Sequence, residues 1–181
     1  MGSEMCIRDS DACTDYNVTD VFTGRPVRTY FKDKQVHISA AVVYGILRYV
    51  EWTGDDSLLD AEGVRTIVEC AKFYYSLLLR RLTREDYEIH DVIGPDEYHE
   101  RINNNGYTNR MAKYVLENAV KVIETAMQRG TLPEEYDGQE LKAKFVDAAE
   151  KLFLQRPHTG EKHENIIEQF DGCLLYTSDA A

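Results

Sequence analysis

Residues 35–82 read QVHISAAVVYGILRYVEWTGDDSLLDAEGVRTIVECAKFYYSLLLRRL, and their apolar pattern indicates the fold class. Its apolar residues recur at helical spacing in two blocks, namely Val36, Ala40, Val43, Leu47 and Val50, then Val64, Val68, Ala71, Tyr75 and Leu78. The spacing predicts a helix from about Val36 to Thr53, which Gly54 ends, and a second that runs to about Leu82. The short polar link at residues 55–57 predicts antiparallel neighbours.

Two more helices are predicted further along the chain. Met111, Val115, Ala119, Val122 and Ala126 lie on one side of a helix that Thr108 caps and Gly130 ends, and Leu141, Phe145, Ala148 and Leu152 mark a fourth. Tyr87 and Ile89 predict only a short extended piece, without a sheet. Successive helical hairpins indicate an all-α fold, either a toroid or another solenoid, and periodicity alone leaves both open.

An acidic turn lies between the second and third helices. Residues 91–100 read DVIGPDEYHE, and residues 103–109 read NNNGYTN. Gly94-Pro95 predicts a turn because glycine allows a positive φ and proline fixes its own, so Glu97 projects from a loop. The surrounding tyrosines and histidine offer aromatic surface, and the asparagine amides suit a hydroxyl-rich ligand. The composition is typical of a sugar site, with a charged surface loop as the alternative.

The turn resembles that of glycoside hydrolase family 65, the inverting maltose, kojibiose, nigerose and trehalose phosphorylases. In that family a Gly-Pro-Asp-Glu-Tyr turn is followed by Asn-Asn-x-Tyr-Thr-Asn, as at residues 94–98 and 104–109. The resemblance extends to residues 35–40 with the helix that follows them, and to Gln-Phe-Asp-Gly at 169–172. Ala41, where the family often has Asp, and Gly106, where Ala is common, depart from the pattern.

The resemblance implies an incomplete (α/α)6 barrel of helical hairpins and a fragment of an α-glucosyl disaccharide phosphorylase. The reaction would convert a disaccharide and phosphate into β-glucose 1-phosphate and a free sugar, with phosphate as co-substrate and no cofactor or metal. Glu97 would be the general acid, and the candidate substrate-binding residues are His37, Asp96, Tyr98, Asn104 and Asn105. For His37, capping of the predicted helix is the favoured alternative to a sugar contact.

Cleavage of a glycosidic bond needs a proton on the leaving oxygen and a nucleophile on the opposite face of the sugar. Burial of Glu97 against Tyr98 or Tyr107, beside the charge of Asp96, would favour its protonated form. The family's phosphate-binding residues follow the 169–172 segment, so a hydrolase that activates water remains an alternative, and a non-catalytic helical binding module is a third. We expect the chain alone to be inactive.

The two ends resemble translated sequencing-adapter read-through on a metagenomic fragment. The predicted division is therefore an artefactual segment at 1–10, a catalytic-domain fragment at 11–172 and an artefactual segment at 173–181. A net charge of −11 disfavours nucleic acid as a partner. The sequence has no apolar run long enough to span a membrane, and we expect a cytoplasmic enzyme whose full-length form is a homodimer.

Two further motifs are judged incidental. His158-Thr159-Gly160-Glu161-Lys162-His163 resembles a zinc-finger linker, but no cysteine pair precedes it. Cys13 and Cys70 lack metal or redox spacing, and Cys70 is predicted to be a buried small hydrophobe. The basic residues of the loop 23–34, where the family varies its acceptor contacts, are predicted to form a solvated surface.

Overall fold

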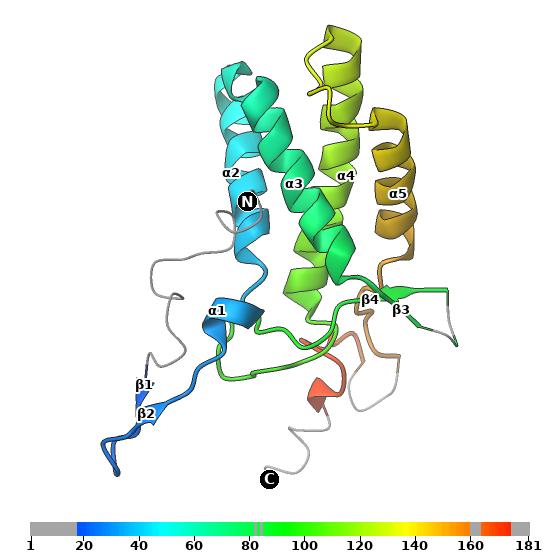
Figure 1. Ribbon diagram of the computed structural model, residues 1–181. Helices are drawn as coiled ribbons and strands as arrows, with labels where there is room; N and C mark the ends of the chain where they lie inside the picture. Colours follow the sequence, from blue (N-terminus) through cyan, green and yellow to red (C-terminus); the bar gives the residue numbers. More distant parts are fainter. Residues whose placement is uncertain (1–17, 82, 84, 160–163, 175–181) are drawn as a thin grey trace.

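Four long helices form the body of the protein in a computed structural model that describes residues 18–81, 83, 85–159 and 164–174. They are α2 (Ile38–Thr53), α3 (Ala61–Leu77), α4 (Gly106–Arg129) and α5 (Gly138–Lys151). Helix α4 packs against both α3 and α5, and α2 lies at the edge against α3 and α4 (Figure 1). The predicted all-α architecture of helical hairpins is confirmed.

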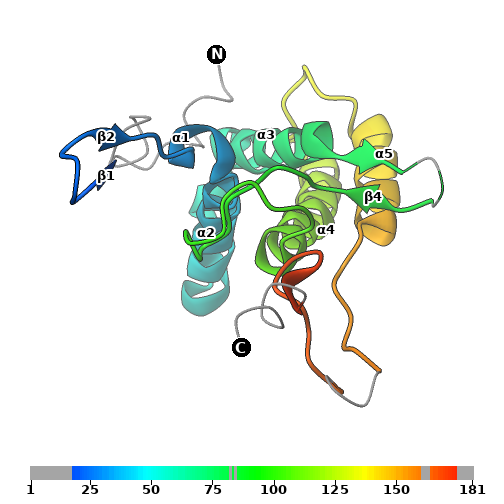
Figure 2. The ribbon, with the colours of Figure 1, turned by 90° about the horizontal axis from the view of Figure 1, so that it is seen from below.

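Short elements connect the helices and occupy one end of them. They are β1 (Val18–Thr19), β2 (Pro26–Val27), α1 (Phe31–Lys34), the 3-10 turn η2 (Ser57–Leu59), β3 (Leu79–Arg80) and β4 (Tyr87–Glu88). Strand β1 pairs with β2, and β3 with β4, both antiparallel. Seen from below, α1, the loop that leads into α4 and the chain that follows α5 gather at the same end of the helices (Figure 2).

The predicted helix ends at glycines are confirmed. Gly54 and Gly130 follow α2 and α4 with φ of 70° and 68°, and each donates its N–H to a carbonyl of the last turn. Left-handed backbone at a helix end is the conformation that glycine adopts without a steric cost.

Two predicted element boundaries are wrong. Helix α3 ends at Leu77 rather than near Leu82, because Leu78 turns extended and Leu79–Arg80 pairs with Tyr87–Glu88. The short extended piece predicted at Tyr87 is confirmed as β4, and its pairing makes a small sheet where none was predicted. Helix α4 begins at Gly106, and its cap is Asn105, whose side chain accepts the Thr108 N–H.

The core lies between the helices and continues under the loop that precedes α4. Its largest buried side chains include Tyr74, Phe145, Ile67, Ile89, Ile93 and Leu116, and Cys70 is buried as predicted. The Tyr74 hydroxyl donates to the Val36 carbonyl at 2.7 Å and accepts the Ala40 N–H at 3.2 Å. Burial raises the pKa of Tyr74, so it stays a neutral phenol that ties α3 to the start of α2.

Several predictions concern residues outside the described part of the chain. The proposed artefactual segment 1–10, Cys13 and nearly all of 173–181 lie there, as does part of the zinc-finger-like stretch. Within the described ranges, no helix combines the length and apolar character needed to cross a bilayer.

Candidate functional site

The acidic turn is the outer part of a loop that folds back on itself between β4 and α4. Val92 and Ile102 form an antiparallel bridge, with N···O distances of 3.0 and 2.9 Å in the two directions. The Ile93 N–H donates to the Lys34 carbonyl at 2.9 Å, which joins the loop to the end of α1. These backbone bonds fix the base of the turn, and residues 94–101 project beyond it.

Two buried asparagines hold this loop from inside. Asn104 exchanges bonds with Ile89: its backbone N–H donates to the Ile89 carbonyl at 2.8 Å, and its Oδ1 accepts the Ile89 N–H at 3.2 Å. Its Nδ2 donates to Asp171 at 2.8 Å. Asn105 accepts from both the N–H and the hydroxyl of Thr108, at 2.9 and 3.0 Å.

Both asparagine side chains are fully buried. Their predicted role was sugar binding, and the structure instead places them against protein atoms. Asn104 also adopts φ of 50°, a left-handed conformation that asparagine tolerates better than most residues.

Gly94 is needed for a different reason from the one predicted. Its φ is not positive, but a Cβ built on it would lie 2.6 Å from Nδ2 of Asn105 and 2.9 Å from Cγ. Glycine therefore permits the close approach between the turn and the cap of α4.

Glu97 lies at the exposed tip of the turn, and Gln35 holds it. The Gln35 amide Nε2 donates to Oε1 of Glu97 at 2.6 Å. The predicted burial of Glu97 is wrong for this chain, because its side chain is exposed and that of Tyr98 is 96% exposed. Tyr107 contacts another candidate instead, since its ring meets that of His37 edge-on at 5.8 Å.

His37 occupies the residue before α2, but among the described residues it makes no side-chain capping bond. His37 is thus the N-cap residue of α2 by position, as the structural alternative predicted, although its side chain does not make the cap. Its Nδ1 is buried without a hydrogen-bond partner in the described part of the chain. Burial lowers the pKa of His37, against the opposing effects of the Ile93 backbone and the Glu97 charge. His37 thus lies within electrostatic range of Glu97 as a predominantly neutral imidazole.

Asp96 joins the turn to the segment that follows α5. Its Oδ2 accepts from Gln169 Nε2 at 3.0 Å and lies 3.0 Å from Nδ1 of His99, and its Oδ1 accepts the Tyr98 N–H at 3.1 Å. The His99 ring packs on Phe170 with centroids 4.9 Å apart. The Gln169 amide, then the Tyr98 N–H and His99, hold the pKa of Asp96 below its usual value, so it is a carboxylate.

Asp91 anchors the other side of the turn. Arg101 Nε donates to its Oδ1 at 2.9 Å and Lys34 Nζ to its Oδ2 at 2.6 Å. These two bonds, Arg101 first, lower the pKa of Asp91. Lys34 is therefore paired, whereas the loop 23–34 was predicted to present solvated basic residues. Arg28 stacks over the Tyr30 ring at 4.8 Å.

We predict that Asp91→Asn destabilises the protein by about 0.5–1 kcal/mol near neutral pH, a small effect because the Asp91 side chain is 39% exposed and solvent screens the pair. Because the pKa of Asp91 is lower in the folded state than in the unfolded state, its carboxylate stabilises the fold at pH values above the unfolded-state pKa. This stabilisation is lost as the pH falls through the folded-state pKa. Urea denaturation of both proteins from about pH 7 to about pH 2 checks this. The difference should vanish at the acid end; a constant difference contradicts the assignment. Asparagine retains the left-handed backbone of residue 91, where φ is 58°.

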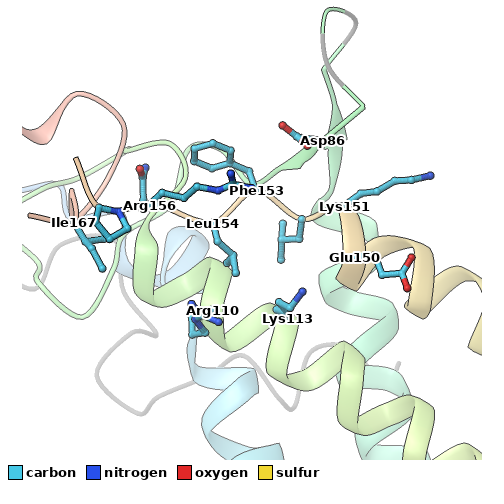
Figure 3. Close-up of a pocket in the computed structure, with 12 residues that line it drawn as sticks. Asp86, Arg110, Lys113, Glu150, Lys151, Phe153, Leu154, Arg156 and Ile167 are labelled. Carbon is cyan, nitrogen blue, oxygen red and sulfur yellow. The ribbon is translucent and has the colours of Figure 1, made fainter. Parts of the chain in front are cut away.

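An open cavity of about 810 Å³ lies elsewhere, between the start of α4, the end of α5 and residues 152–157 (Figure 3). Its lining carries both basic and acidic side chains, and no residue of the acidic turn is among them. Gln155 is the link between the two places, since it lines the cavity and donates to the Asn104 carbonyl and to Asp171. The described residues contain no group of three His, Cys, Asp or Glu side chains placed to hold a metal ion.

Known proteins match this chain over most of its length. It is 55% identical over 167 residues to the nigerose phosphorylase of Lachnoclostridium phytofermentans, covering 90% of this chain and 22% of that protein. It is 35% identical over 166 residues to the 1,2-alpha-glucosylglycerol phosphorylase of Bacillus selenitireducens, covering 90% of this chain and 21% of the relative.

A solved structure described as "Putative kojibiose phosphorylase from human microbiome" superposes with a TM-score of 0.61 at 25% identity, covering 77% of this chain and 19% of that one. The helical hairpins are thus an incomplete (α/α)6 barrel, and the chain spans about a fifth of the length of the relatives it matches. The profile of the glycosyl hydrolase family 65 central catalytic domain matches residues 7–178. With this match and these relatives, the chain belongs to glycosyl hydrolase family 65.

Proposed function

We propose that this chain carries the general acid, Glu97, of an inverting α-glucosyl disaccharide phosphorylase. The observation that carries the proposal is the position of Glu97: an exposed carboxyl at the tip of a tethered turn, in a chain similar to several phosphorylases. The neighbouring carboxylates Asp91 and Asp96 are bonded to protein partners on both sides of the turn. Glu97 and Glu100 are both exposed glutamates of the turn, and Glu97 is the one that the Gln35 amide holds.

In the proposed reaction Glu97 gives its proton to the glycosidic oxygen as the bond from that oxygen to the anomeric carbon breaks. A phosphate oxygen attacks the same carbon from the opposite face, which gives β-glucose 1-phosphate and a free sugar. Phosphate is already an anion near neutral pH, so no second carboxylate is required as a base. Glu97 regains a proton from solvent before the next cycle.

The remaining candidate residues divide into two groups. We assign His37, Asp96 and Tyr98 to the sugar site, because His37 lies near Glu97, Asp96 precedes it in the turn, and the exposed Tyr98 ring is free to stack on a sugar face. Asn104 and Asn105 are assigned to support of the loop, because both are buried and bonded to protein atoms.

Residues 11–172 are proposed to be an internal segment of a longer catalytic domain. The relatives are about five times as long as their matched segments, and the exposed setting of Glu97 leaves room for further parts of the site to cover it. The chain alone is therefore expected to be inactive. The full-length enzyme is proposed to be a cytoplasmic homodimer that uses phosphate and needs no cofactor.

The full-length enzyme should release β-glucose 1-phosphate from an α-glucobiose only when phosphate is present. Nigerose is the first substrate to test, since the nigerose phosphorylase is 55% identical to this chain, and the other α-linked glucobioses complete the panel. Glucose and glucose 1-phosphate are measured separately, with and without phosphate. Phosphate-independent glucose release would instead identify a hydrolase, and no turnover of any member would favour a binding module.

A further inference from the structure

Gln35 is a residue that sequence patterns did not single out for the site, yet it makes a short contact with the proposed acid. The residue is 8% exposed, and its Nε2 lies 2.6 Å from Oε1 of Glu97. The described residues give the Glu97 carboxyl no other hydrogen bond.

The backbone around Gln35 is fixed on three sides. Its N–H donates to the Phe31 carbonyl at 3.1 Å, which closes α1. The preceding carbonyl, of Lys34, accepts the Ile93 N–H at 2.9 Å, and the following carbonyl, of Val36, accepts the Tyr74 hydroxyl at 2.7 Å. The backbone that carries the Gln35 side chain is therefore bonded to α3, to α1 and to the base of the acidic turn, whereas Glu97 itself lies on an exposed tip.

We propose that Gln35 is a positioning residue for the general acid, an inference that rests on the proposed function of Glu97. An amide N–H donates and cannot take up a proton, so the oxygen that faces Gln35 stays an acceptor. The transferable proton then resides on Oε2, the oxygen left free to face the glycosidic bond. Gln35 also selects one rotamer for a side chain that solvent exposure would otherwise leave mobile.

A leaving-group comparison in the full-length enzyme tests this role. Gln35→Met keeps the length of the side chain and removes the donor. We expect kcat for disaccharide phosphorolysis to fall about tenfold, since a small misplacement of a catalytic group costs up to about 10²-fold. Phosphorolysis of α-glucosyl fluoride should change less than about twofold, because fluoride leaves without a full proton from the acid. An equal loss on both substrates would mean a structural role and overturn the proposal, as would no loss on either.

Gln155→Met is the matched control. Gln155 also donates from a partly buried amide, to Asn104 and Asp171, but does not touch Glu97. Its replacement should lower both activities by the same factor. If Gln35→Met does not fold, as judged by circular dichroism, Gln35→Asn takes its place: it keeps an amide that is too short to reach Glu97 and should give the same selective loss. If Gln35→Asn lost activity equally on the disaccharide and on α-glucosyl fluoride, the proposal would be overturned.

Glu97→Gln in the same assay separates this inference from the proposed function. A selective loss on the disaccharide in Glu97→Gln, without one in the Gln35 variants, would reject positioning by Gln35 and leave Glu97 as the acid. Equal losses on the two substrates in Glu97→Gln would reject the proposed function itself. A selective loss in both variants, larger for Glu97, is the result we expect.

Discussion

Glu97→Gln in the full-length enzyme is expected to lower kcat for disaccharide phosphorolysis by about 10²–10⁴-fold, the range that general acid catalysis contributes. The amide has nearly the shape of the carboxyl and can still accept a hydrogen bond from Gln35, whose Nε2 lies 2.6 Å from Oε1 of Glu97. The turn should therefore keep its conformation. What is lost is the proton for the leaving oxygen, so sugar binding should persist while turnover falls.

Initial rates of β-glucose 1-phosphate formation, together with calorimetric binding of the disaccharide, check this expectation. The matched control is Glu100→Gln, because Glu100 is an exposed glutamate of the same turn and has no role in the proposed site. Its turnover should stay within about twofold of the parent, as is usual for surface substitutions. Comparable turnover in Glu97→Gln and the parent would remove Glu97 from the acid role.

Local sequence patterns predicted the helices well because their signals lie within the helices themselves. The apolar spacing of 36–50 and 64–78 located α2 and α3, and glycines with open left-handed geometry ended α2 and α4. The end of α3 was missed because it depends on a partner strand, Tyr87–Glu88, rather than on its own residues. Helical propensity at Leu78–Arg80 was outweighed by that pairing.

The site was predicted less completely than the fold because its contacts join distant parts of the sequence. Residue types suggested that the asparagines bind sugar, but burial of Asn104 follows from its bonds to Ile89 and Asp171, the latter 67 residues away. Gln35 lies 62 positions from Glu97, and the pattern around it gave no sign of that pairing. A short turn motif can identify an acid candidate, whereas the groups that orient it emerge from the packing.

Asn104→Ala should lower the free energy of local opening of the loop 89–105 by about 3 kcal/mol. The change removes the acceptor of the buried Ile89 N–H and the donor to Asp171. A buried unsatisfied group costs about 1–3 kcal/mol. Alanine would also have to adopt the φ of 50° that Asn104 has, at about 1–2 kcal/mol.

Hydrogen exchange in the full-length enzyme measures this opening. Comparison with Asn104→Gly separates the effect of the lost hydrogen bonds from that of backbone strain. At about 1.4 kcal/mol per tenfold change, the amides of the loop should exchange about 100-fold faster in Asn104→Ala. Glycine loses the same hydrogen bonds but adopts φ of 50° without strain, so its exchange should be about tenfold slower than that of Asn104→Ala. Equal exchange in the two variants would rule out backbone strain, and parental exchange in both would rule out a supporting role. Because Gly94 packs against Asn105, the next residue, loosening at 104 should reach the base of the turn and lower turnover together with loop protection.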